Sequence, residues 1–127
     1  MSWDHKTAAN SLVGIVAAAD YSSGSAQNRF VSITAANTAT LTGAGARADA
    51  ICYNKPASGD PMEGVAFGFG KVTAGAAVAA GAEVMSDATG RAVTATSTNR
   101  SVGVAINAGA AAGDLITVKL GGAGRVL

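Results

Sequence analysis

Residues 83–94, Glu-Val-Met-Ser-Asp-Ala-Thr-Gly-Arg-Ala-Val-Thr, predict a β-hairpin. The segments 83–86 and 91–94 carry the apolar and β-branched residues, and the short connection between them ends in Gly90. Such a connection is typical of hairpins, because glycine adopts the backbone conformations of a tight turn at little cost. We therefore expect two antiparallel strands at this point in the chain.

Similar short segments, separated by turns rich in glycine, occur along the whole sequence. They are residues 12–16, 29–34, 48–54, 65–69, 101–106 and 115–120. Segment 74–82 is rich in alanine, but its two glycines favour a turn–strand–turn element, with a one-turn helix as the alternative. Strands at this spacing predict an all-β fold, a small β-barrel or β-sandwich of short antiparallel strands.

Segment 65–69 alternates strictly between large and small side chains. Val65, Phe67 and Phe69 would point to one side of a strand, and Ala66 and Gly68 to the other. We expect the two aromatic side chains to lie in the core, and the small residues to lie against a neighbouring backbone.

The composition predicts one domain that gains stability by association. The chain has 127 residues, of which 17 are glycine and 30 are alanine, so large apolar side chains are few. Burial of each large apolar side chain stabilises a fold by about 1.5–3 kcal/mol, so contacts with further copies would help such a chain. We expect an extended N-terminal arm over 1–11, a single β domain over 12–120, a C-terminal tail over 121–127, and a homo-oligomer.

The charge distribution excludes several classes of partner. Charged residues make up 13% of the chain, nine of them basic and eight acidic, and they form no basic stripe. Binding of a phosphate backbone requires clustered Lys and Arg, so nucleic acid is not an expected partner. The longest apolar run, Leu12–Ala19, is far shorter than the about 20 residues of a membrane-spanning helix. We expect neither a membrane partner nor a secretion signal.

The residues on which enzymes and metal sites depend are scarce. His5 is the only histidine, and it lies in the predicted arm, where no rigid scaffold would hold it in the geometry of a catalytic triad. With one histidine and one cysteine, Cys52, a single chain cannot form a zinc site of Cys and His. Cys52 lies on the face of segment 48–54 opposite to Ile51 and Tyr53, and we expect it to be a small core residue. No glycine-rich stretch has the pattern of a phosphate-binding loop. We expect no enzyme, no cofactor and no metal.

Four carboxylates are candidates for acid–base catalysis. Asp60 and Glu63 flank a proline in a loop and lack the apolar or charged neighbours that such catalysis needs, so we expect solvated turn residues. Asp87 and Asp114 each lie near a glycine at the end of a predicted strand, which is ordinary turn chemistry.

Three pieces of the second half follow one another in a recognisable order. They are the glycine-bounded segment 72–81 followed by the hairpin with its Asp87 and Gly90, the sequence Val-Gly-Val-Ala at 102–105, and the closing segment 112–120. Together they make the sequence from Lys71 onward resemble the capsid decoration, or head cement, proteins of tailed bacteriophages. The first half matches that family only loosely.

The resemblance implies both a fold and a function. Such proteins are small β-barrel or β-sandwich domains that lie as trimers or other small oligomers on the outer capsid surface. They add contacts across capsomer boundaries, so the major capsid protein and further copies of the chain are the implied partners. The implied location is the virion, after synthesis in the host cytoplasm. The family has no catalytic residues to transfer.

The arm holds the residues that we expect to contact a partner. Trp3 is the only tryptophan of the chain, and it lies in a segment without periodicity. We expect Trp3 to be an aromatic anchor on the capsid, with Asp4, His5 and Lys6 as polar contacts beside it.

Three other functions remain open from the sequence. One is another structural subunit of a phage virion, such as a tail-tube protein, which shares this composition. Another is a carbohydrate-binding or adhesin-like β module, which would display several exposed aromatic side chains. The third, a small hydrolase, is disfavoured by the shortage of histidine and cysteine.

Overall fold

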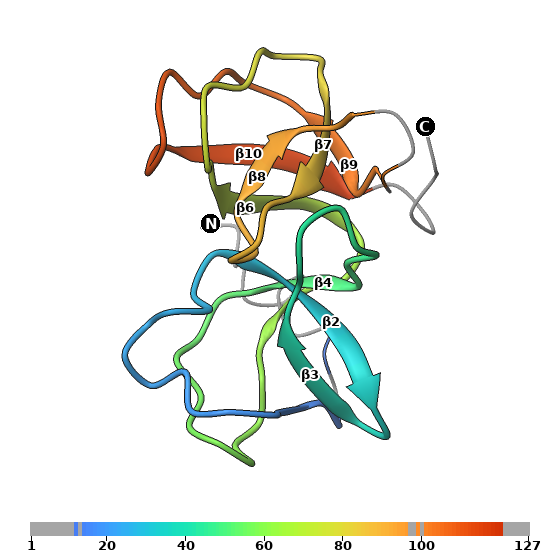
Figure 1. Ribbon diagram of the computed structural model, residues 1–127. Coiled ribbons are helices and arrows are strands. Elements are labelled where there is room, and N and C mark those ends of the chain that lie inside the picture. Colours follow the sequence, from blue (N-terminus) through green and yellow to red (C-terminus); the bar gives the residue numbers. More distant parts are fainter. Residues whose placement is uncertain (1–11, 13, 97–98, 100, 121–127) are drawn as a thin grey trace, which may run out of the picture.

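The structure, a computed structural model, consists of two five-stranded β-sheets and describes residues 12, 14–96, 99 and 101–120 (Figure 1). None of these residues is helical, so the predicted all-β fold is confirmed. In chain order the strands are β1 (Val16–Ala17), β2 (Arg29–Ala35), β3 (Thr38–Leu41), β4 (Ala50–Cys52), β5 (Gly64–Val65), β6 (Gly68–Thr73), β7 (Glu83–Ser86), β8 (Ala92–Thr94), β9 (Gly103–Ala105) and β10 (Leu115–Leu120). The predicted arm and tail lie outside the described residues.

The first half of the chain forms one sheet and the second half the other. The strand orders are β1-β3-β2-β4-β5 and β6-β10-β9-β7-β8. The predicted hairpin is confirmed, since β7 and β8 pair antiparallel with Met85 opposite Val93. In the second sheet β10 lies between β6 and β9, and all six of its residues pair with β6. Only β1 and β3 are parallel among the paired strands.

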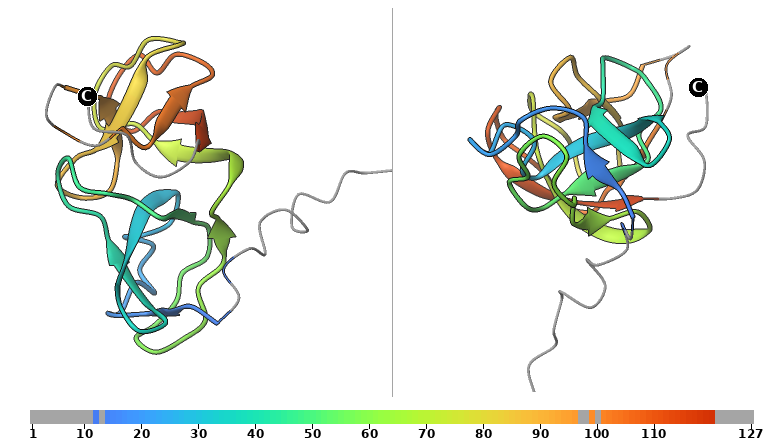
Figure 2. Two further views of the ribbon diagram at one scale, coloured as in Figure 1. Left: turned by 90° about the vertical axis from the view of Figure 1, so that its right-hand side faces the viewer. Right: turned by 90° about the horizontal axis from the view of Figure 1, so that it is seen from below.

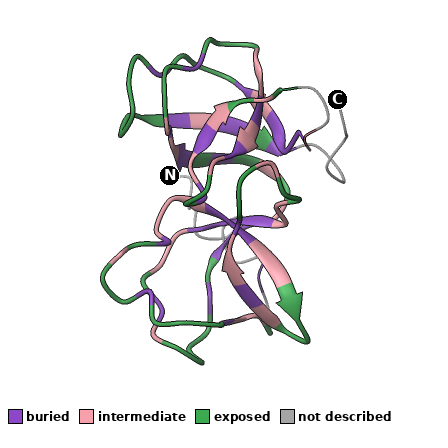
Figure 3. Cartoon of the chain, in the orientation of Figure 1, coloured by how far each residue is buried: buried purple, intermediate pink, exposed green. Residues whose placement is uncertain are grey.

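One hydrophobic cluster lies between the two sheets. Phe30 and Ile51 from the first sheet meet Val72, Val84 and Ile116 from the second, and all five are fully buried. The buried positions in Figure 3 are accordingly concentrated where the sheets meet. The views of Figure 2 show the two sheets from the side and from below. Burial of these side chains in one shared cluster makes the two sheets a single packing unit.

A second cluster covers the other face of the first sheet. Its buried members are Leu12, Ala17, Tyr21, Ala26, Val31, Ala39, Ala50, Cys52 and Met62. Neighbouring residues of β4 therefore point into different clusters, with Ile51 in the first and Cys52 in the second. The alternation predicted for segment 48–54 is present, and both of its faces are buried.

The first strand is shorter than predicted and begins later. The amide of Ile15 donates to the carbonyl of Leu12 at 3.2 Å, and Gly14 has a φ of +81°. This turn occupies most of the predicted strand 12–16, so β1 begins only at Val16. The prediction of a strand from residue 12 was wrong because Gly14 adopts a positive φ, which interrupts the extended backbone that the β-branched residues favour.

Strand β3 was not predicted. It follows β2 through a turn in which Asn37 has a φ of +55°, a conformation that asparagine tolerates better than most residues. Its sequence, Thr-Ala-Thr-Leu, buries only Ala39 fully, so it carries little hydrophobic signal. In segment 74–82 the structure has no helix but a chain with turns and isolated bridges at Ala74 and Val78, in place of the strand between turns that was predicted.

Candidate interaction surface

The residues expected to contact a partner, Trp3, Asp4, His5 and Lys6, lie outside the described residues. The described part of the chain offers a different surface, which we did not predict. Phe67 is 79% exposed and Phe69 is 64% exposed, so two of the three phenylalanines of the chain lie in solvent. Their predicted place in the core was wrong.

The exposure of Phe69 follows from a break in the predicted strand 65–69. The chain leaves the first sheet after Val65 and enters the second at Gly68, whose φ of +93° changes the direction of the backbone. The alternation that begins at Val65 therefore does not continue into β6. Within β6 the buried side is that of Gly70 and Val72, and Phe69 lies on the outer side.

A glycine is required on the inner side of β6 because Tyr53 approaches it closely. A Cβ added to Gly70 would lie 2.9 Å from the Tyr53 hydroxyl and 3.0 Å from Cδ1 of Ile51. The Tyr53 hydroxyl accepts a hydrogen bond from the amide of Lys71 at 2.9 Å. Tyr53 thus satisfies a backbone amide at the free edge of β6, where a further strand would otherwise pair. The same hydrogen bond holds the Tyr53 ring in place.

A groove of about 590 Å³ lies beside Phe69, where the first sheet meets β6 and β10. It is lined mainly by apolar and aromatic groups, and Lys71 is the one charged residue of its lining. The lining residues are Asn28, Tyr53, Val65, Phe69, Gly70, Lys71, Leu115 and Thr117. Contiguous exposed apolar surface of this kind marks sites of interaction in soluble proteins. We call these residues, together with Phe67, the aromatic surface.

The outer face of the second sheet continues the aromatic surface. In the register of β6 and β10, Lys119 lies opposite Phe69 and Thr117 opposite Lys71. Leu115, at the start of β10, is 48% exposed and also lines the groove. Large apolar groups and two lysines therefore share this face, and neither lysine forms an ion pair with any described residue.

The single cysteine has the role predicted for it. Cys52 is fully buried, and burial raises the pKa of its thiol to about 11. The thiol donates to the Asn54 side-chain oxygen at 3.4 Å. A reactive cysteine requires a pKa near or below neutrality, so this thiol has the chemistry of a core residue.

Asp60, Asp87 and Asp114 each belong to a turn closed by a backbone hydrogen bond, as predicted, whereas Glu63 lies outside a turn, directly before β5. Asp114 accepts hydrogen bonds from the amides of Ala110 and Ala111, and Asp60 accepts one from Ala57. Glu63 is exposed. Among the described residues, no group of three or more His, Cys, Asp and Glu side chains is placed to hold a metal ion. No helix in that part of the chain is long and apolar enough to cross a membrane.

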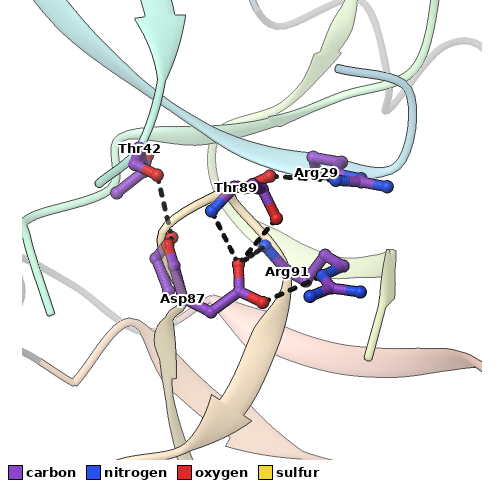
Figure 4. A network of polar contacts seen from close by, with 6 residues as sticks. Arg29, Thr42, Asp87, Thr89 and Arg91 are labelled. Atoms are coloured by element: carbon purple, nitrogen blue, oxygen red, sulfur yellow. Dashed lines mark hydrogen bonds and ion pairs between the residues drawn. The ribbon is translucent and has the colours of Figure 1, made fainter. Parts of the chain in front are cut away.

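Asp87 organises a polar network that connects the two sheets (Figure 4). Its carboxylate accepts hydrogen bonds from the amides of Thr89 and Arg91 at 2.9 and 2.8 Å, and from Nε of Arg91 at 2.9 Å. Partial burial acts to raise the pKa of Asp87, but these hydrogen bonds and the guanidinium outweigh it and hold the pKa below its ordinary value. These hydrogen bonds fix the conformation of the turn, so its carbonyl groups are held in position to contact the first sheet.

The same turn is bonded to strand β2 and to the residue after β3. The amide of Phe30 donates to the carbonyl of Gly90 at 2.7 Å, and the Arg29 guanidinium donates to the carbonyl of Thr89 at 3.1 Å. The hydroxyl of the buried Ser86 shares its single proton between the carbonyl of Asp87 at 2.8 Å and the carbonyl of Thr42 at 3.2 Å. Hydrogen bonds thus join the sheets in addition to the shared hydrophobic cluster.

Comparison with known proteins adds two findings. Residues 22–120 match the model of a family described as phage cement protein. The fold is similar to the crystal structure of the head fiber gp8.5 N base of bacteriophage phi29, with a TM-score of 0.68. That similarity covers 89% of this chain and 95% of the other at 16% sequence identity, so it shows the fold alone. No curated protein matches the sequence.

The family match covers most of the chain, including every strand except β1, the aromatic surface and the Asp87 turn. It agrees with the resemblance found in the second half of the sequence and extends it to most of the first half. This chain therefore belongs to the phage cement protein family and is a structural protein of a phage virion.

Proposed function

We propose that this protein binds the outer surface of a phage capsid and stabilises the shell by bridging neighbouring capsid subunits. The observation that supports the proposal is the aromatic surface, with Phe67 and Phe69 exposed on a domain of the cement family. Large aromatic side chains in solvent serve no purpose in the packing of the domain itself. They are typical anchors of protein interfaces, where their burial provides most of the binding energy.

The energy of the aromatic surface suits a protein that acts by bridging. Burying one phenylalanine side chain is worth about 1.5–3 kcal/mol, so the pair offers roughly 3–6 kcal/mol before the cost of association. One such contact is weak. A protein that touches two or more subunits gains avidity, because every contact after the first is intramolecular.

The remaining parts of the proposal come from the sequence. We propose the arm residues Trp3, Asp4, His5 and Lys6 as a further contact with the capsid, next to a single domain over 12–120. Self-association into a small oligomer, a trimer by resemblance, would multiply the number of contacts per particle. The proposed partners are the major capsid protein and further copies of the chain, with neither nucleic acid nor membrane among them, and the protein is proposed to have no enzymatic activity.

Co-sedimentation with expanded, DNA-free heads of the cognate phage tests the aromatic surface. We expect the double variant F67A/F69A to bind at least about tenfold more weakly, since interface anchors cost 2 kcal/mol or more when truncated. Ile106→Ala is the matched control, because Ile106 is an exposed apolar residue that does not line the groove. Equal binding by the double variant and the control would refute the role of the surface.

Two further measurements separate the parts of the proposal. Deletion of residues 2–10 is expected to abolish capsid binding and to leave the domain folded, and unchanged binding would exclude the arm contact. Cross-links from one protein to two capsid subunits, and slower disruption of decorated heads on heating, are expected of a bridge. A protein that cross-links to one subunit only is not a bridge.

The two exposed phenylalanines also fit the expectation for a carbohydrate-binding module. A glycan array tests this second function directly. Binding of the wild-type protein but not of F67A/F69A to a glycan, together with no binding to heads, would favour it over the capsid proposal.

A further inference from the structure

The groove of the aromatic surface combines apolar walls with one positive charge that no lining residue neutralises. Tyr53, Val65, Phe69 and Leu115 provide apolar walls, and Lys71 provides a positive charge at the same place. No carboxylate belongs to the lining, and Lys71 forms no ion pair with a described residue. The matching occupant is a large apolar side chain that is directly followed or preceded by a carboxylate.

The chain contains one such pair outside the described residues. Asp4 is the only acidic residue among positions 1–11, 13, 97–98, 100 and 121–127, and it follows Trp3, the only tryptophan. An indole is the largest apolar side chain, and the groove of about 590 Å³ has room for it. Trp3 and Asp4 therefore have the size and charge that the groove requires.

The arm also starts close enough to reach the groove. The carbonyl of Ile15 accepts a hydrogen bond from the amide of Met62 at 2.9 Å, and Met62 precedes the lining residue Val65 by three positions. An extended chain covers about 3.3 Å per residue, so the residues between Leu12 and Trp3 span up to roughly 30 Å. The three positions from Met62 to the lining residue Val65 correspond to at most roughly 10 Å of extended chain, which is about a third of the reach of the arm.

We propose that in the free protein Trp3 and Asp4 occupy the groove of their own chain, with the indole against Phe69 and the carboxylate beside Lys71. The tether favours the same chain over a neighbour, because attachment through a short stretch of chain can provide an effective concentration in the millimolar range. The contact covers an apolar groove and a tryptophan that would otherwise both face solvent before assembly. Binding to a capsid would exchange this intramolecular contact for the contacts proposed above.

Intrinsic fluorescence tests the proposal on the full chain, because Trp3 is the only tryptophan. We expect its emission to be blue-shifted, and its quenching by acrylamide to be weaker, than in a synthetic peptide of residues 1–11. Phe69→Ala and Lys71→Glu should both move these values towards those of the peptide. The charge reversal should lower the ratio of docked to undocked arm roughly two- to fivefold, as expected for an exposed ion pair.

Matched variants separate docking from other effects. Lys55→Glu makes the same charge change at an exposed residue outside the groove and should leave the emission unchanged. The charge swap D4K/K71E should restore the wild-type emission. Phe69 and Lys71 are exposed, so their variants should keep the far-ultraviolet circular dichroism of the wild type.

Three results would overturn the proposal. The first is wild-type emission and quenching equal to those of the peptide. The second is emission that is blue-shifted but unaffected by Phe69→Ala and Lys71→Glu. The third is a blue shift that disappears on dilution, which would assign the groove to the arm of a neighbouring copy. None of these measurements involves heads, so the docking of the arm and the capsid-binding function fail or succeed separately.

Discussion

Replacement of Asp87 by alanine is expected to weaken the connection between the two sheets. The carboxylate accepts hydrogen bonds from the amides of Thr89 and Arg91 and from the Arg91 side chain, all at 2.8–2.9 Å. These bonds hold the turn whose carbonyls accept from Arg29 and Phe30 of the first sheet. Alanine leaves the two amides without their acceptor and frees the turn to move away from β2.

The expected loss can be worked from these contacts. A hydrogen bond to a charged group contributes about 1.5–3 kcal/mol, and the lower value applies to the two amide bonds because the site is partly exposed. The Arg91 ion pair, 33% and 19% exposed at its two side chains, adds about 0–1 kcal/mol. Asp87→Ala should therefore lower the free energy of unfolding by about 3 kcal/mol. Asp87→Asn keeps an oxygen acceptor for the amides and should cost about 1 kcal/mol.

Urea denaturation, followed by circular dichroism at several pH values, measures both effects. Because the folded-state pKa of Asp87 lies below its ordinary 3.8, its ionised form stabilises the fold above that pH. The contribution is lost as the pH falls through the lowered folded value, so wild type and Asp87→Asn should converge in acid. A loss below about 0.5 kcal/mol for Asp87→Ala at neutral pH, or no convergence in acid, would refute the reasoning, since surface changes typically fall within that limit.

Three further predictions concern the core and the groove. Cys52, buried with a thiol pKa raised to about 11, should react with a thiol reagent at pH 8 only after denaturant is added; rapid labelling of the native protein would contradict its burial. Gly103→Ala places a Cβ 2.0 Å from the Lys119 carbonyl oxygen and should cost about 3 kcal/mol or more in urea denaturation, whereas Gly43→Ala, with nothing within 4 Å, should be nearly neutral. Similar costs for both would exclude the steric explanation. Tyr53→Phe removes the acceptor for the Lys71 amide and should lower the free energy of unfolding by about 1 kcal/mol, and an unchanged melting temperature would show that water replaces it.

The sequence was sufficient to predict strands β7 to β10 of the second sheet, because these four strands carry their own local signals. Strand β6 was predicted only in part, as the end of segment 65–69. The hairpin of β7 and β8 has β-branched residues on both sides of a turn that ends in Gly90, whose φ is +80°. The strand β10 alternates buried and exposed residues from Leu115 to Leu120, which is the period expected of a strand with one face in the core. In these elements the local pattern and the tertiary packing agree.

The aromatic surface could not be predicted from alternation, because alternation gives the faces of a strand and not which face is buried. Large residues are normally assigned to the core, and here the core side of β6 is taken by Gly70, against which Tyr53 and Ile51 already pack. That approach comes from a different strand, more than fifteen positions earlier in the chain. The available signal was Gly68 between two phenylalanines, which in retrospect indicates a break in the strand.

The arm contact was predicted from an isolated tryptophan, and it stays a prediction. No packing pattern surrounds Trp3, so the sequence indicates that the residue needs a partner but not which one. The structure contains a groove of suitable chemistry at Tyr53 and Lys71. The groove could not be predicted from the sequence, because its walls come from both sheets.

The position of β10 between β6 and β9 determines when the second sheet can be completed during synthesis of the chain. β9 pairs with β10 and also with the earlier strand β7. β10 is the only strand that pairs with β6 in the described part of the chain, so β6, which begins at Gly68, has no strand neighbour until the ribosome has translated Leu115–Leu120. Pairing over such a sequence separation is slow, and an unpaired strand edge is open to association with other nascent chains. A host that translates this chain on crowded polysomes would thus hold β6, with Phe69 on it, unpaired until the last strand emerges.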